Sequence, residues 1–161
     1  MPNIFSIVYH PLDQEYQDRE GDYIRHPLKN AQLIAGRGIE GDQKAGHNPD
    51  RNLNLISLEW LEALEPQGYK TAPGQFGEQI IVQGLAVETL EPGARLLLGS
   101  EAVIEVTKLR TGCERLEAAQ GKKVKGVLGP LGAMAKVITG GAIQVGDPVA
   151  VQETATAAGD D

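Results

Sequence analysis

Cys113, the single cysteine of this 161-residue sequence, lies in its most basic segment. Residues 108–125 contain six Lys or Arg and two Glu, a local charge of +4 in a chain whose net charge is −7. Arg110 and Arg115 stand within a few residues of the cysteine on either side. Positive charges near a thiol favour the thiolate, which is a nucleophile and a soft metal ligand. The alternative is an inert cysteine in the core, the commonest place for a free cysteine.

The residues around Cys113 also predict where it lies on a helix. Residues 111–114 (Thr-Gly-Cys-Glu) have the form of a capping box, with threonine as the N-cap and glutamate three residues later. A helix would then run through Ala119 and end at Gly121. Cys113 would occupy its first turn, where free N–H groups and the helix dipole favour an anion.

The segment before the cysteine alternates in polarity and predicts a strand. One face holds Ala102, Ile104 and Val106, and the other holds Val103, Glu105 and Thr107. Continued extension would place Lys108 and Arg110 on the apolar face, at the open end of the core. Two cations there are costly unless they are solvated or bind an anion. We therefore predict a pocket that holds a thiolate and a small anionic ligand, whereas Lys122, Lys123 and Lys125 fit a solvated cluster.

Composition excludes several function classes. The acidic net charge argues against a broad nucleic-acid footprint, and one cysteine excludes an internal disulfide framework. No apolar run approaches the roughly 18 residues of a membrane helix, and the first five residues do not resemble a secretory signal. His10, His26 and His47 show no metal-ligand spacing. We expect a cytoplasmic protein that binds neither membrane nor nucleic acid.

The glycine-rich stretch 36–41 (Gly-Arg-Gly-Ile-Glu-Gly) matches G-x-G-x-x-G. A dinucleotide-binding fold requires a helix to begin there, and Gly46 and Pro49 disfavour one. We predict a turn that binds neither NAD nor ATP. Contact of this backbone with another ligand stays open.

Short runs rich in β-branched residues, bounded by glycine and proline, predict a mainly β protein. The predicted strands are 5–9, 31–35, 53–57, 79–83, 95–98, 102–108, 133–139 and 148–152. Many short strands with close turns favour a barrel or sandwich over a βαβ sheet. A second helix is predicted at 57–65, and a hairpin with two glycines of positive φ at 139–142.

The domain organisation is simple. We expect one domain over residues 1–152, with an irregular surface loop at 12–27. Residues 153–161 are small or acidic and predict a disordered tail.

Several stretches together resemble one known family, the MOSC domain, which forms the C-terminal part of molybdenum-cofactor sulfurases and also occurs as stand-alone bacterial proteins. The matching stretches are 38–42 (G-[LI]-x-G-D), 51–57 (R-x-[VL]-[ST]-L-[IY]-S), 73–80 (P-G-x-F-G-E-N-[IL]), 106–116 (V-T-x-x-R-x-P-C-x-x-L) and 146–149 (G-D-x-[VI]). The sequence departs from the pattern at two positions. Gln79 stands where the family usually has Asn, and Gly112 where it usually has Pro.

The resemblance implies a closed β-barrel of complex topology with two or three short helices. It implies that Cys113 is the catalytic residue and metal ligand. The residues expected to bind the cofactor are Arg110, Lys108, Arg115, Asp42, Phe76 and Glu78. Lys108 and Arg110 would hold the phosphate or other anionic groups, and the last three would shape the pocket wall.

Two roles follow from the family. One is sulfur transfer through a cysteine persulfide, and the other is ligation of molybdenum with reduction of N-hydroxylated compounds; either would make the protein an enzyme. The implied cofactor is molybdopterin, and pyridoxal phosphate belongs to a separate domain of the sulfurases. The implied partners are a cysteine desulfurase or a redox protein. The alternative is a non-catalytic module that binds a small anion, or carries persulfide to a protein partner.

Overall fold

The computed structural model describes residues 1–11, 25–43, 45–46, 48–124 and 128–152, with the backbone alone for Glu114 and Arg115. The predicted tail 153–161 and residues 12–24 of the predicted loop lie outside this part. The end of that loop is not irregular, because residues 26 and 27 belong to a short strand, His26–Leu28.

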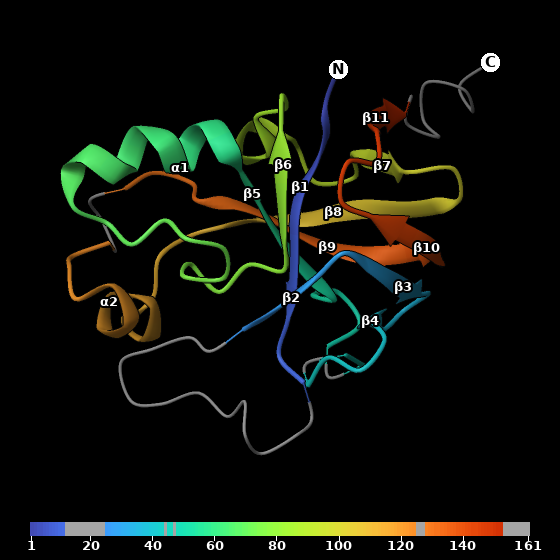
Figure 1. The fold of residues 1–161 in the computed structure, drawn as a ribbon, viewed down its shortest axis with the longest axis horizontal. Coiled ribbons are helices and arrows are strands. Elements are labelled where there is room, and N and C mark those ends of the chain that lie inside the picture. Colours follow the sequence, from blue (N-terminus) through green and yellow to red (C-terminus); the bar gives the residue numbers. More distant parts are fainter. Residues whose placement is uncertain (12–24, 44, 47, 125–127, 153–161) are drawn as a thin grey trace.

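Most strands belong to one large sheet with the order β11-β7-β8-β9-β5-β6-β1-β2 (Figure 1). Its strands are β1 (Asn3–Tyr9), β2 (His26–Leu28), β5 (Leu53–Ser57), β6 (Ile80–Gln83), β7 (Arg95–Leu98), β8 (Ala102–Arg110), β9 (Gly132–Thr139) and β11 (Val149–Gln152). All neighbours are antiparallel except β5 and β6. The mainly β prediction is confirmed, because each predicted strand is present within two residues at its ends.

A second sheet has the order β10-β3-β4, with β3 (Asn30–Ile34), β4 (Gly38–Ile39) and β10 (Gly141–Gln144). The predicted hairpin at 139–142 is wrong, because β10 pairs with β3 and not with β9. Neither Gly140 nor Gly141 has a positive φ. Gly140 is required by a close approach instead, since a Cβ there would lie 2.5 Å from the carbonyl oxygen of Leu33.

The helices are short. They are α1 (Leu58–Leu64), α2 (Glu114–Gln120) and the 3-10 turns η2 (Glu65–Gln67) and η3 (Val87–Thr89). The first confirms the predicted helix at 57–65, with Ser57 as its N-cap. None of the helices in the described part is long and apolar enough to cross a membrane.

The predicted capping box at 111–114 is wrong. The N-cap of α2 is Cys113, which has extended backbone (φ −142°, ψ 168°) and makes no side-chain cap hydrogen bond. The extension from β8 persists beyond Arg110, whose carbonyl accepts a hydrogen bond from Leu131 (2.8 Å). The predicted end of the helix is confirmed, because Gly121 is a left-handed C-cap (φ 69°).

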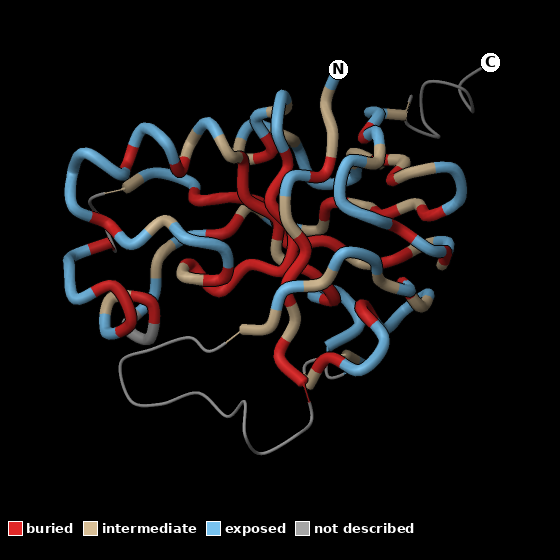
Figure 2. The backbone as a smooth tube through the Cα atoms, viewed as in Figure 1, coloured by how far each residue is buried: buried red, intermediate tan, exposed pale blue. Residues whose placement is uncertain are grey.

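The buried residues form two apolar clusters, one on each face of the large sheet. Figure 2 shows that buried segments run through the middle of the fold and exposed ones lie at its outer turns. We call the face that carries Ile104 and Val106 the core face, and its cluster extends to the small sheet through Leu33 and Ile143. The opposite face carries Ile56 and is covered by residues of both α-helices, so we call it the helix face. The helix-face cluster consists of Ile56, Leu61, Leu64, Tyr69, Phe76, Ile81, Leu116, Ala119, Val124 and Leu131.

The closed barrel is not confirmed. Within the described residues the large sheet ends at β11 and β2. An isolated bridge between Asn3 and Pro148, with a hydrogen bond from Ile4 N to Asp147 O (2.9 Å), joins the start of β1 to the segment before β11. This contact brings β1, the strand next to one end of the order, close to β11 at the other end without a continuous ladder.

Candidate functional site

A β-bulge in β8 decides which way its cations face. Val106 pairs with Ala135 but Lys108 pairs with Met134, so Thr107 is an extra residue without a partner in the ladder. Beyond it Leu109, not Lys108 or Arg110, packs against the core-face cluster. The prediction that both cations lie on the face of Ile104 and Val106 is therefore wrong. They lie on the helix face.

Arg110 is buried there, with 6% of its surface exposed, near the carboxylate of Glu78, which is 1% exposed. Glu78 accepts hydrogen bonds from the backbone N–H groups of Gly74 (2.6 Å) and Phe76 (3.1 Å). Burial raises the pKa of Glu78 above its ordinary value, while the hydrogen bond from Gly74 and the positive charge of Arg110 oppose that rise. Glu78 thus links the turn at 74–77 to the end of β8.

Phe76 anchors the same turn from the other side. Its ring is fully buried and makes an edge contact with Trp60 (5.3 Å between centroids) and a tilted one with Tyr69 (6.3 Å). Gly74 and Gly77 have positive φ (87° and 74°), which lets the chain turn tightly around the carboxylate. The observed contacts of Phe76 and Glu78 stabilise this turn, and a role in a pocket wall remains a prediction.

Cys113 is exposed, so the core-cysteine alternative is wrong. It lies three residues after Arg110, between the end of β8 and α2. Because it is the N-cap of a helix of only seven residues, the expected support from a first helical turn no longer applies. What remains is an accessible sulfur at a strand-to-helix junction.

The helix after Cys113 is tied to the segment that leads to Glu78. Gln120, at the end of α2, accepts a hydrogen bond from Lys70 N (2.6 Å) and donates to the carbonyls of Lys70 (2.9 Å) and Gln75 (3.1 Å). Lys70 Nζ donates to Ala119 O (2.8 Å). The segment that contains Cys113 is therefore held on both sides, by the pairing of β8 before it and by the contacts of the end of α2 with residues 70–75 after it.

Lys108 and Asp42 lie apart from this arrangement. Lys108 is exposed and lines a pocket of about 510 Å³ together with Arg51. Asp42 is buried and lines another pocket of about 440 Å³; its Oδ1 accepts a hydrogen bond from His10 N (2.8 Å), while Oδ2 accepts none from the residues that the structure describes. The side chain of Arg115 lies outside the described part. The structure thus brings together Phe76, Glu78 and Arg110, and not Lys108 or Asp42.

The glycine-rich stretch 36–41 forms β4 and turns, so the prediction that no helix begins there is confirmed for the described residues. Asn52 holds it in place: its Nδ2 lies within hydrogen-bond distance of the carbonyls of Gly36 (3.3 Å) and Asn48 (3.0 Å). A Cβ on Gly38 would lie 2.7 Å from the carbonyl oxygen of Asn52. The close approach explains this glycine without any ligand.

Gln79, one of the departures from the family pattern, has a structural contact of its own. Its Oε1 accepts a hydrogen bond from the backbone of Asn54 (2.7 Å), and its side chain is buried. This contact connects the start of β6 to β5.

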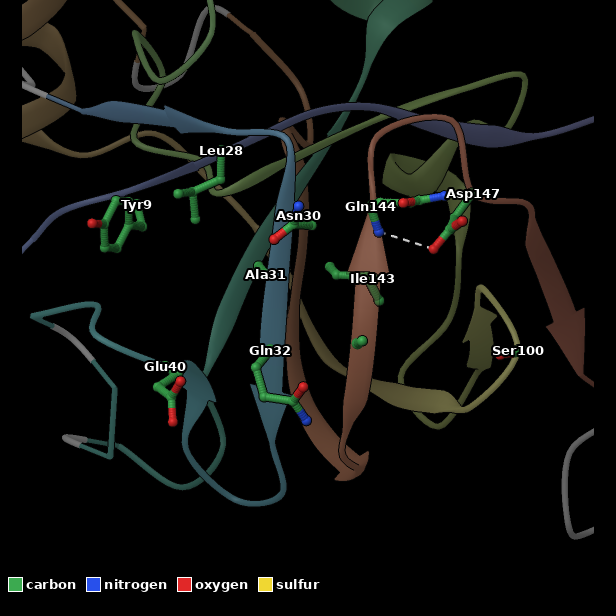
Figure 3. A pocket seen from close by; sticks show the side chains of 11 residues that line it. Tyr9, Leu28, Asn30, Ala31, Gln32, Glu40, Ser100, Ile143, Gln144 and Asp147 are labelled. Carbon is green, nitrogen blue, oxygen red and sulfur yellow. Dashed lines mark hydrogen bonds between the residues drawn. The ribbon is translucent and has the colours of Figure 1, made fainter.

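Sequence analysis missed a pocket of about 600 Å³ along β3 and β10 (Figure 3). The amide side chains of Asn30, Gln32 and Gln144 line it, and Tyr9 and Leu28 lie at one side. Gln144 N donates to Asp147 Oδ2 (2.9 Å) at its edge. Its residues come from segments that are distant in sequence and joined by the unpredicted β10–β3 pairing, so no local motif indicates it. Neither Cys113 nor Arg110 lines this pocket.

The fold is a mainly β one, with a mixed large sheet and an exposed cysteine between a strand and a short helix. The model of the MOSC domain matches residues 42–150, and the chain belongs to this family. The resemblance in the sequence is therefore confirmed. None of the curated proteins matches the sequence.

Solved structures show the same fold. YiiM from Geobacillus stearothermophilus is 21% identical with a TM-score of 0.68, covering 95% of this chain and 76% of its own. The YuaD protein from Bacillus subtilis is 19% identical with a TM-score of 0.70, covering 92% of this chain and 94% of its own. YiiM from Escherichia coli is 22% identical with a TM-score of 0.60, covering 95% and 70%. At these identities the likeness concerns the fold.

Proposed function

We propose that this chain is a molybdenum-cofactor-associated protein in which Cys113 carries the chemistry, as a carrier of persulfide sulfur or as a ligand of molybdenum. Membership of the MOSC family links the chain to molybdenum-cofactor biology. The observation that carries the proposal is that the sole cysteine is exposed, three residues beyond the buried Arg110, at a junction held from both sides. A cysteine kept only for packing would be buried.

A metal at Cys113 would have to bring ligands of its own. Among the described residues no three His, Cys, Asp or Glu side chains gather closely enough to hold a metal ion. A metal at Cys113 would therefore take one soft protein ligand, and the remaining ligands would come from the cofactor. A molybdopterin-type cofactor supplies sulfur ligands and a metal able to exchange oxygen and electrons.

In the sulfur-carrier role, the chemistry belongs to Cys113 itself. Its thiolate attacks the terminal sulfur of a persulfide on a donor protein, the sulfur–sulfur bond of the donor breaks, and the donor cysteine leaves as a thiolate. No external oxidant or reductant is needed. The exposed position leaves the sulfur accessible to such a partner, for which we propose a cysteine desulfurase, or a redox protein if molybdenum is bound.

The experiment compares the wild type with Cys113→Ser after purification from a host that makes the cofactor. Molybdenum is measured by elemental mass spectrometry, and persulfide by alkylation and intact mass. We expect either stoichiometric molybdenum or a mass increase of one sulfur atom in the wild type, and neither in the variant, because oxygen is a poorer ligand for both roles. Unchanged circular dichroism shows that the variant folds. A wild type with neither metal nor persulfide would overturn the proposal.

A further inference from the structure

The bulge in β8 anchors a loop from another part of the chain. The hydroxyl of the bulge residue, Thr107, donates to the carbonyl of Asp50 (2.5 Å). The loop itself turns at residues 48–51, where Asp50 N donates to Asn48 Oδ1 (3.0 Å) and Arg51 N to Asn48 O (3.1 Å). Two stretches of the family pattern, beginning at Arg51 and at Val106, therefore meet at one point.

The other end of the loop is fixed by Asn52, which is buried. Its backbone N–H donates to Ala135 O (2.9 Å), and its Oδ1 accepts from Val137 N (2.8 Å). The backbone of Arg51 thus lies between two anchored residues. Its exposed side chain lines the same pocket of about 510 Å³ as Lys108, together with Thr107, Gly93 and Asp50.

Within the described part of the chain, some charged residues of this pocket form ion pairs and others do not. Glu105 also lines it, but its carboxylate is paired with Arg95 (3.0 Å) and Lys136 (3.7 Å). Arg51 and Lys108 form no ion pair with any residue that the structure describes. The carboxylate of Asp50 is the one opposing charge that the described lining leaves unpaired.

We infer that Arg51 and Lys108 form a subsite for the phosphate of a phosphate monoester, in the pocket over the β8 bulge. A guanidinium offers a planar fork to two phosphate oxygens, and an ammonium adds a point charge. A dianion is favoured over a carboxylate, because the two cations outweigh the one negative charge of Asp50 and attract the more highly charged group more strongly. The pocket is larger than a free phosphate ion requires, which leaves room for the esterified group.

This inference rests on the proposed function for its biological ligand, and it assigns the phosphate contact to Arg51 and Lys108 rather than to Arg110. Arg110 is buried near a carboxylate on the helix face, whereas Arg51 and Lys108 are exposed in one pocket. The binding of phosphate can be measured without cofactor, so it can be tested separately.

The experiment is an NMR titration of the isotopically labelled protein with inorganic phosphate and with glycerol phosphate at constant ionic strength. We expect saturable shifts of the backbone amides of Asn48, Gly93 and Thr107, with the ester binding at least as tightly as phosphate. Arg51→Ala and Lys108→Ala should each weaken binding by about tenfold or more, since each removes a charge-assisted contact. Both side chains are exposed, so both variants should fold.

Two further variants make the test specific. Asp50→Asn should tighten binding, because it removes the opposing carboxylate from the pocket. Lys29→Ala removes an exposed cation that does not line the pocket and should leave binding unchanged. Shifts that grow without saturation, or an equal effect of Lys29→Ala and Lys108→Ala, would overturn the subsite. A wild type that carries molybdenum or persulfide but binds no phosphate would overturn the subsite alone. A wild type that binds phosphate but carries neither molybdenum nor persulfide would overturn the proposed function alone.

Discussion

Glu78 and Arg110 carry opposite charges and interact electrostatically, and both are buried on the helix face. They come from distant parts of the chain, since Glu78 precedes β6 and Arg110 ends β8. Burial raises the pKa of Glu78, and the nearby guanidinium opposes the rise. The carboxylate also receives two backbone N–H groups from its own turn. This pair connects the turn at 74–77 to the strand that leads to Cys113, so its charge state matters for both.

The titration of Glu78 should contribute to the pH dependence of the free energy of unfolding. Because its pKa is raised from 4.5 in the folded protein, the folded state keeps the proton after the unfolded chain has lost it. This group therefore contributes a fall in the free energy of unfolding as the pH rises from about 4.5 through the folded pKa, and no further change above it. Urea unfolding at a series of pH values should show this component in the wild type and not in Glu78→Gln. Equal slopes for both proteins would contradict it.

Removing Arg110 should destabilise the domain, because its side chain is buried near the carboxylate of Glu78. Arg110→Ala leaves the buried carboxylate without its nearby cation, and we expect a loss on the order of 1 kcal/mol in the free energy of unfolding. The double variant Arg110→Ala with Glu78→Gln should recover part of that loss. Urea denaturation of the wild type, both single variants and the double variant measures the coupling, and simple additivity would show that the two residues do not interact.

The bulge should depend on the hydroxyl of Thr107. Thr107→Val keeps the shape and β propensity of the side chain but removes its hydrogen bond to Asp50 O. We expect a loss of about 1 kcal/mol in the free energy of unfolding, measured by thermal denaturation. Amide exchange should increase at Asp50 and Arg51 more than elsewhere, and an unchanged exchange rate there would show that the loop is held by other contacts.

Gly132 should be intolerant of any side chain. A Cβ at this position would lie 2.1 Å from the carbonyl oxygen of Leu55 on the neighbouring strand. Gly132→Ala should therefore cost about 2 kcal/mol or more, because the two strands must separate. Gly129→Ala is the matched control: nothing lies within 4 Å of its Cβ position and its stability should be nearly unchanged. A similar melting temperature for both variants would contradict the close approach.

Most strands and the helix α1 could be predicted from the pattern of neighbouring residues. Short apolar runs bounded by turn residues placed β5 and β7 at their observed bounds, and the apolar spacing after Ser57 located α1. The ordered stretches from Gly38 to Val149 were sufficient to indicate the family, because each keeps its residue types at fixed spacing and all occur in the family's order. These features depend on residues close together in the chain, which is why they could be predicted.

The sequence by itself therefore determined most of the strands, the family and the presence of one cysteine in a basic segment. Only the tertiary structure decided where the functional side chains point. The alternation of polar and apolar residues cannot reveal that Thr107 has no pairing partner on β9. This bulge moves Lys108 and Arg110 to the other face of the sheet. It also requires the loop at Asp50, 57 residues earlier, to hold the bulge. Such contacts join distant segments, so their effect on exposure and charge becomes visible only when the strands are paired.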